Sequence, residues 1–193
     1  APTLTGLGER SHLANERIDL TTHVLDVVNE VKWKDLDNIV LCGHSYGGMV
    51  VTGAVEQIHD RVASIVYLDS FLPQNGQSLD DIMGRERPST QTMVAPFTAE
   101  QFNVNVADRA WVNSKMTPQS VACFQEKLTL TDAVNRIPKK TYVMAKIGTM
   151  PAFRANYERL TKDPGWRTHA LDSGHDVMID NPAGLAKILM GAI

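Results

Sequence analysis

The sequence predicts an α/β fold, in which a mostly parallel sheet is covered by helices on both faces. Two observations support this. Short continuous apolar runs are typical of strands buried on both faces of a parallel sheet. These runs alternate along the chain with stretches of helical periodicity, and crossovers between parallel strands place such helices over the sheet. The chain has 193 residues, which is long enough for a compact domain with a sizeable core.

Four runs are predicted to form the strands, and four stretches the main helices. The strands are expected at residues 39–42, 63–68, 141–147 and 166–171. The first is apolar throughout, so we expect it to be buried on both faces. Helices are expected around residues 20–31, with nearby threonines as caps, at 49–58, at 153–160, and after the Asn181–Pro182 pair, which is typical of a helix start.

Residues 74–135 interrupt this alternation. They contain three prolines and short amphipathic pieces, and they are too long for an ordinary connection. We interpret them as a mostly helical cap over one end of the sheet, inserted into a core formed by residues 1–73 and 136–193. A disordered linker is the alternative interpretation.

Composition and charge exclude several classes of protein. The net charge of −3 gives no sign of a nucleic-acid or anionic-membrane surface. No apolar run approaches membrane-spanning length, and the first residues do not resemble a signal peptide, so we expect a soluble, cytoplasmic protein. Two cysteines do not indicate a disulfide framework. Metal-binding motifs such as H-E-x-x-H are absent, so no metal or other cofactor is predicted.

The stretch Gly43-His44-Ser45-Tyr46-Gly47 matches G-x-S-x-G between a predicted strand and a predicted helix. In this setting the serine occupies a sharp, strained turn, and the flanking glycines leave room for neighbouring backbone. The pattern therefore predicts Ser45 as a nucleophile. The backbone N–H of Tyr46, at the start of the helix, is the predicted donor to an oxyanion.

A serine hydroxyl needs a base to become a good nucleophile. His175 follows the last predicted strand, and parallel strands bring their carboxyl ends to one edge of the sheet. We therefore expect His175 beside Ser45 as general base and acid. His44 is set aside because, next to Ser45, its side chain should point the other way. His23 has no evident partner in the sequence.

Asp69 is the predicted third member, which would orient the imidazole. It ends the second predicted strand, at the same edge as Ser45. The usual position for the acid follows the third strand, where "KIGTMPAF" contains no carboxylate. Asp172 and Asp176 remain alternatives, although both are close to His175 in the chain.

Four segments carry a family resemblance: "PTLTGLGERSHL", "VLCGHSYGGMV", "VYLDSFLP" and "SGHDVMIDNP". They resemble the α/β-hydrolase superfamily, and in particular an esterase subgroup with plant methylesterases, hydroxynitrile lyases and bacterial pyrethroid and carbamate esterases. The resemblance implies an α/β-hydrolase sheet, Ser45 as nucleophile, His175 as base, Asp69 as acid, and residues 74–135 as the cap.

One feature of that family has no match here. Its second oxyanion donor comes from a His-Gly motif after an earlier strand, which lies beside the strand ending at Cys42. We therefore expect the functional protein to include roughly 30 or more further N-terminal residues, the size of one strand–helix unit, either in the same polypeptide or as a separate chain. Without them the edge of an apolar strand would stay open.

These observations predict a serine hydrolase that cleaves small carboxylic or carbamic esters through an acyl-enzyme. The predicted partner is a small-molecule ester, with no nucleic acid and no membrane. A hydroxynitrile lyase, an acyltransferase and a non-catalytic ligand receptor are the alternatives. Substrate contacts are expected from four apolar side chains of the cap: Phe102, Trp111, Met116 and Phe124.

Overall fold

The computed structural model describes residues 1–193 and contains a four-stranded sheet in the order β1-β2-β5-β6. All neighbouring strands in it are parallel. The strands are β1 (Ile39–His44), β2 (Val62–Leu68), β5 (Lys139–Ala145) and β6 (Arg167–Leu171). The predicted α/β class and the four predicted strands are therefore confirmed.

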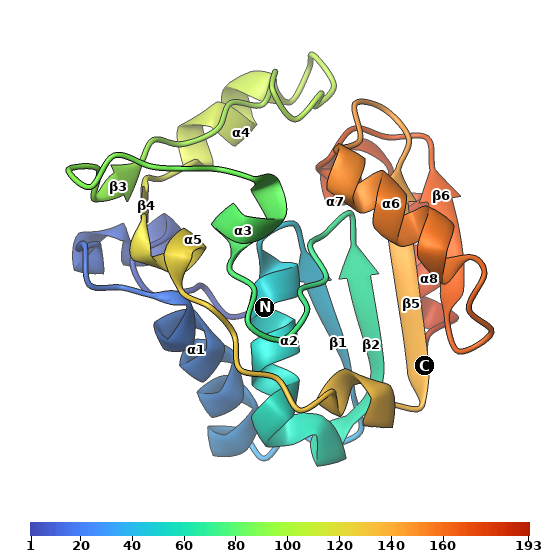
Figure 1. Ribbon diagram of the computed structural model, residues 1–193. Coiled ribbons are helices and arrows are strands. Elements are labelled where there is room, and N and C mark those ends of the chain that lie inside the picture. The colour runs from blue at the N-terminus through green and yellow to red at the C-terminus, as the bar shows by residue number, and fades with distance from the viewer.

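Helices cover both faces of this sheet (Figure 1). The strand β2 shows why, because its side chains alternate between two apolar clusters. Ile65 and Tyr67 belong to the cluster that includes α1, α2 and α6, whereas Val66 and Leu68 belong to the one that includes α7 and α8. The helices of the two layers are α1 (Leu20–Trp33), α2 (Gly47–Ile58), α6 (Pro151–Leu160), α7 (Val177–Asp180) and α8 (Pro182–Met190).

Local sequence explains where two of these helices start. The side chain of Asn181 accepts a hydrogen bond from the Gly184 amide and caps α8, as predicted. At α1, however, the cap is Asp19, which accepts from the Thr22 amide at 2.8 Å, and not a threonine. The chain also contains three short 3₁₀ helices, at Gly8–Leu13, His59–Arg61 and Ala133–Arg136. None of the helices combines the length and apolarity needed to cross a bilayer.

The strand β1 lies at one edge of the sheet and pairs only with β2. The sequence predicts a strand buried on both faces, and this prediction is wrong for the structure. Of its six residues only Gly43 is buried, and Cys42 is exposed. The reason is that no strand or helix covers the outer edge of β1.

The part of residues 74–135 up to α5 lies at the end of the sheet to which the strands β1 and β2 point, and the chain after α5 runs back to the opposite end, where β5 begins (Figure 1). Their elements are α3 (Leu79–Met83), β3 (Met93–Val94), α4 (Arg109–Lys115), β4 (Gln119–Ser120) and α5 (Ala122–Gln125). These helices are short, and loops containing the three prolines separate them, because proline is not accommodated inside a helix. The division into core and cap remains an interpretation of this arrangement.

A buried ion pair lies between α3 and the loop that follows it. Arg87 makes a two-pronged contact with Asp80 of α3, with Nε 2.5 Å from one carboxylate oxygen and a terminal nitrogen 2.8 Å from the other. Both side chains are less than a tenth exposed. The guanidinium also lies 5.0 Å from the ring centroid of Phe124 in α5. Arg87 therefore connects α3 to α5.

Replacing Arg87 with methionine should lower the free energy of unfolding by about 3–5 kcal/mol, because it leaves the Asp80 carboxylate buried without a partner. Urea denaturation measures this. Lys127→Met is the matched control, since Lys127 pairs with the neighbouring Asp81 on the exposed surface, and such pairs contribute little. Equal stability of the two variants would contradict the prediction.

Candidate active site

Ser45 occupies the turn between β1 and α2 in a left-handed conformation, with φ of 53°, which is unfavourable for a serine. Hydrogen bonds hold it on both sides. Its amide donates to the Leu68 carbonyl at 3.2 Å, and its carbonyl accepts from the amides of Gly48 and Phe71 at 3.0 and 3.2 Å. The surrounding backbone therefore fixes the strained turn, as expected for a residue held in place for function.

The glycines around Ser45 differ in how closely the backbone approaches them. A Cβ atom on Gly43 would lie 2.6 Å from the Gly47 carbonyl oxygen, whereas nothing lies within 4 Å of one on Gly47. A Cβ on Gly48 would lie 2.0 Å from the carbonyl oxygen of Phe71. The prediction that neighbouring backbone lies close to both flanking glycines is therefore confirmed for Gly43 and wrong for Gly47. The glycine with the least space for a side chain is Gly48, which the sequence motif does not indicate.

The backbone N–H of Tyr46 has no acceptor among the turn and loop hydrogen bonds of the chain. Tyr46 directly precedes the first residue of α2. Unpaired amides at a helix N-terminus, together with the helix dipole, favour an anion. The structure thus leaves a free donor next to Ser45.

His175 and Asp69, which are 106 residues apart, meet at this edge of the sheet. The Nδ1 atom of His175 lies 2.7 Å from Oδ2 of Asp69, and both residues are buried. The other oxygen of Asp69 accepts from the Ala145 amide at 2.9 Å. A carboxylate can only accept, so Nδ1 carries the hydrogen, and Nε2 is left free to take up a proton.

The two alternative carboxylates lie elsewhere. Asp172 is 83% exposed and pairs with Lys146. Asp176 lies 3.9 Å from His44 and makes no hydrogen bond to the His175 ring. Among the three candidate acids, only Asp69 contacts the imidazole of His175.

Ser45 and His175 both line a cavity of about 440 Å³. No hydrogen bond joins the serine hydroxyl to the imidazole in this structure. In ligand-free enzymes such bonds are often long or poorly aligned and shorten only when substrate binds. The topology has therefore brought both groups to one cavity, although no hydrogen bond joins them.

Most of the cavity wall is apolar, and it includes Phe102, Met116 and Phe124. The ring of Phe102 packs 4.8 Å from that of His175. Trp111, the fourth predicted contact, does not line the cavity. It is 57% exposed, because α4 buries the neighbouring Val112 instead.

His44 lies against His175, and the expectation that its side chain points away from the site is wrong. The two ring centroids are 4.5 Å apart, and Nε2 of His44 donates to the His175 carbonyl at 2.9 Å. Burial, reinforced by the neighbouring His175, lowers the pKa of His44 to about 3. His44 is therefore a neutral hydrogen-bond donor to the backbone of His175.

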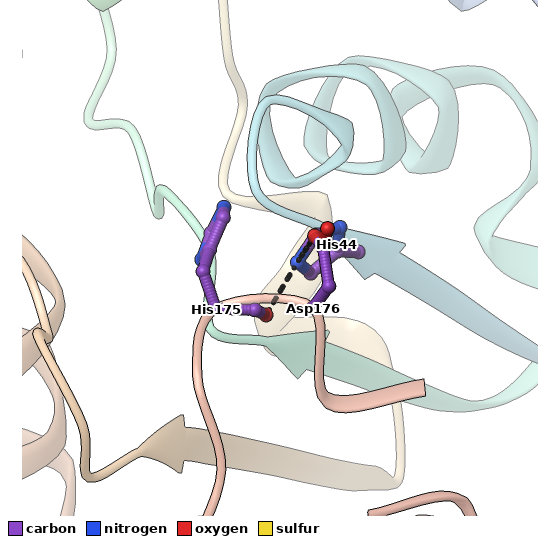
Figure 2. Close-up of side chains that lie close together, drawn as sticks. All are labelled: His44, His175 and Asp176. Carbon is purple, nitrogen blue, oxygen red and sulfur yellow. Dashed lines mark hydrogen bonds and ion pairs between the residues drawn. The ribbon is translucent and has the colours of Figure 1, made fainter. Parts of the chain in front are cut away.

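His44, His175 and Asp176 form the one group of side chains whose spacing could suit a metal ion, with their ligand atoms within 4.8 Å of one another. Figure 2 shows the side chains of His44 and Asp176 side by side, with His44 bonded to the carbonyl of His175. Both histidines already use a ring nitrogen in a hydrogen bond, His44 to this carbonyl and His175 to Asp69. Burial raises the pKa of Asp176. One ring nitrogen of each histidine is therefore already occupied within the protein.

Residues 1–188 match the alpha/beta hydrolase family. The chain belongs to this family. It is 35% identical over 205 residues to a carbendazim hydrolyzing esterase of Nocardioides sp. (strain SG-4G), with 97% of this chain and 85% of that protein covered. It is 23% identical over 152 residues to putative methylesterase 15 of Arabidopsis thaliana, covering 78% of this chain but 32% of that protein.

Solved structures show the same fold. An extracellular alpha/beta-hydrolase from a Paenibacillus species superposes with a TM-score of 0.77 at 20% identity, covering 99% of this chain and 85% of that one. The pyrethroid hydrolase PytH gives a TM-score of 0.69 at 16% identity, covering 97% and 82%. The family resemblance predicted from the sequence segments is confirmed.

Adding a methyl group at Gly48 should disturb the turn that holds Ser45. We expect Gly48→Ala to lower the free energy of unfolding by about 1–3 kcal/mol, because the new Cβ meets the Phe71 carbonyl. Gly47→Ala, one residue earlier, has open space and should leave stability near that of the unmodified protein. Urea denaturation of both variants provides the test, and a fully stable Gly48→Ala protein would show that the contact is easily relieved.

The low pKa of His44 predicts a loss of stability in acid. Its folded pKa of about 3 lies below the unfolded value of about 6.5. Between these values the unfolded chain binds a proton that the folded chain does not, so the free energy of unfolding falls as the pH drops through this window. His44→Gln should make the dependence between pH 6.5 and 4 shallower. An unchanged slope in denaturation curves would refute this assignment.

Proposed function

We propose that this protein is a serine esterase that cleaves small carboxylic or carbamic esters through an acyl-enzyme. The observation that carries the proposal is the buried hydrogen bond between Asp69 and His175, at a cavity that also contains Ser45 on its strained turn. The 35% identical relative is named as an esterase, and this supports the same class of reaction.

In this mechanism, Oγ of Ser45 attacks the ester carbonyl carbon while Nε2 of His175 takes its proton. The negative charge that develops on the carbonyl oxygen is stabilised by the Tyr46 N–H and by the N-terminus of α2. His175 then gives the proton to the departing alcohol, which leaves an acyl group on Ser45. A water molecule, deprotonated by His175, attacks this acyl-enzyme and releases the acid.

Asp69 has an orienting and electrostatic role in this scheme. Its hydrogen bond keeps the hydrogen on Nδ1, so that Nε2 faces the reaction, and its charge stabilises the imidazolium that forms in each step. Because Asp69 is buried and also held by the Ala145 amide, it cannot easily turn away from His175.

The cavity indicates what kind of ester would fit. Its apolar walls, including Phe102, Met116 and Phe124, suit an apolar or aromatic acyl or alcohol group. All three side chains come from residues 74–135, so we propose that this segment acts as the substrate-selecting cap.

The second donor of the oxyanion hole remains a prediction. The family resemblance places it on a His-Gly segment after a strand beside β1. The outer edge of β1 is unpaired in the structure, and we propose that such a strand pairs there in the functional protein.

A fluorophosphonate titration, followed by assays with p-nitrophenyl esters and aryl carbamates, tests the proposal. We expect stoichiometric labelling of Ser45 and a loss of at least about 10³-fold in kcat for Ser45→Ala. Asp69→Asn should lose on the order of 10⁴-fold, because the wrong tautomer of His175 becomes favoured. The matched control is Asp172→Asn, which removes an exposed carboxylate near His175 in the chain and should keep wild-type rates.

Two outcomes would reject this function. One is ester turnover that survives in Ser45→Ala, since no other residue is proposed to attack the carbonyl. The other is release of cyanide from a cyanohydrin without any ester turnover, which would favour a hydroxynitrile lyase.

A further inference from the structure

Residues 98–116 form a small lobe around α4, which contributes Phe102 and Met116 to the cavity wall. The buried side chains of this α4 lobe gather in an apolar cluster of their own, apart from the main core: Ala99, Val104 and Val112. Of the residues that pack against this cluster, only Ile179 of α7 lies outside the lobe. Apolar packing of the cluster therefore links the lobe to the core at α7.

Three hydrogen bonds join the α4 lobe to the rest of the chain, and all of them lead to the segment of His175 and α7. The His175 amide donates to the Phe102 carbonyl at 2.9 Å. The backbone amide and the side-chain amide of Asn105 both donate to Oδ1 of Asp180, at 3.0 and 2.9 Å. The loop before α4 accordingly extends toward α7 (Figure 1). All other hydrogen bonds of the lobe are internal.

Asp180, the last residue of α7, serves partners on two sides. Its Oδ1 accepts from Asn105, and its Oδ2 accepts from the amide of Gly174 at 2.9 Å. Gly174 directly precedes His175, and a Cβ atom on it would lie 2.3 Å from the carbonyl oxygen of Asn103. The backbone of the lobe therefore lies directly against the residue before His175, and the carboxylate of Asp180 bonds to both.

His175 depends on the lobe for one of its own hydrogen bonds. Its ring is bonded to Asp69, and its carbonyl accepts from His44 and from the Val177 amide. Its N–H, in contrast, is bonded to the Phe102 carbonyl of the lobe. The Phe102 ring also packs 4.8 Å from the imidazole. Movement of the lobe away from α7 would therefore break the bond to the His175 amide and withdraw a ring from beside the imidazole.

We propose that Asp180 is a positioning residue of the active site: by linking the α4 lobe to the segment of His175, it holds Phe102 and the backbone of His175 in place. A carboxylate suits this position because all three groups that it faces are N–H donors, and a carboxylate only accepts. The effect on catalysis rests on the proposed esterase function, whereas the link itself does not.

Asp180→Asn tests this because it keeps the shape of the side chain and removes one acceptor. In either orientation of the new amide, its NH₂ group faces an N–H of Asn105 or of Gly174, so one side of the link is lost. In the ligand-free protein we expect the His175 amide to exchange with deuterium about tenfold faster, because the lobe opens more often. Exchange is followed by NMR.

The same variant should also be a slower enzyme. With a p-nitrophenyl ester at saturation, we expect kcat per site titrated by a fluorophosphonate to fall about tenfold, because His175 is less often correctly placed for proton transfer. Counting only titrated sites separates this effect from a loss of folded protein.

Asp108→Asn is the matched control. The Asp108 carboxylate accepts from the same Asn105 side chain at 2.7 Å, but within the lobe, so exchange at His175 and kcat should both keep their wild-type values. If Asp180→Asn does not fold, Asn105→Ala decides. It removes the side-chain bond to Asp180 and keeps the bond of Asp180 to Gly174, so it should change exchange and kcat in the same direction.

Wild-type exchange at the His175 amide in Asp180→Asn would overturn the inference. Faster exchange with wild-type kcat per titrated site would do so too, as would an equal acceleration at all core amides, which reports a general loss of stability. A wild-type protein that is neither labelled nor active on esters would instead overturn the proposed function, and the exchange comparison would still show whether Asp180 holds the lobe.

Discussion

The buried hydrogen bond between Asp69 and His175 is the interaction on which the arrangement of the site depends. A carboxylate removed from water is costly unless its oxygens are hydrogen-bonded. Here one oxygen accepts from the Ala145 amide at the end of β5, and the other faces the imidazole at 2.7 Å. The amide of Asp69 donates to the Val143 carbonyl of the same strand. Two hydrogen bonds with β5 therefore hold Asp69 independently of its contact with His175, which lies in the loop after β6.

Two strained residues lie at the ends of neighbouring strands, and they are connected. Ser45 follows β1 and Asp69 follows β2, and both have positive φ, of 53° and 38°. In the register of these strands His44 is opposite Leu68, and the Leu68 carbonyl accepts from the Ser45 amide. The pairing of β1 with β2 thus holds the turn at Ser45, and the pairing of β2 with β5 holds the turn at Asp69. Strain of this kind persists only where the surrounding structure determines it, which is typical of functional sites.

The sequence was sufficient for the number and parallel direction of the strands, but not for the position of β1 at an edge of the sheet, nor for what depends on packing between elements. Apolar runs and helical periodicity predicted the four strands and main helices, and the shared edge of parallel strands led to Ser45, Asp69 and His175 as candidates. The contact of His44 with His175, the exposure of Trp111 and the tight position of Gly48 could not be read in this way. Each is decided by a side chain or carbonyl from a distant segment, and local patterns carry no information about it.

Buried hydrogen bonds and ion pairs, and not only apolar packing, hold the side chains that line the cavity. Phe124 is held on one side by the Arg87 guanidinium, which the Asp80 carboxylate fixes, and on another by the ring of Tyr46, which His23 fixes. Apolar contacts are non-directional, so they would allow such a ring to shift with little loss of energy. Buried hydrogen bonds and ion pairs are directional and costly to break. A wall held in this way stays in place when substrates differ, so selectivity would come from the fit of the ester to a fixed surface.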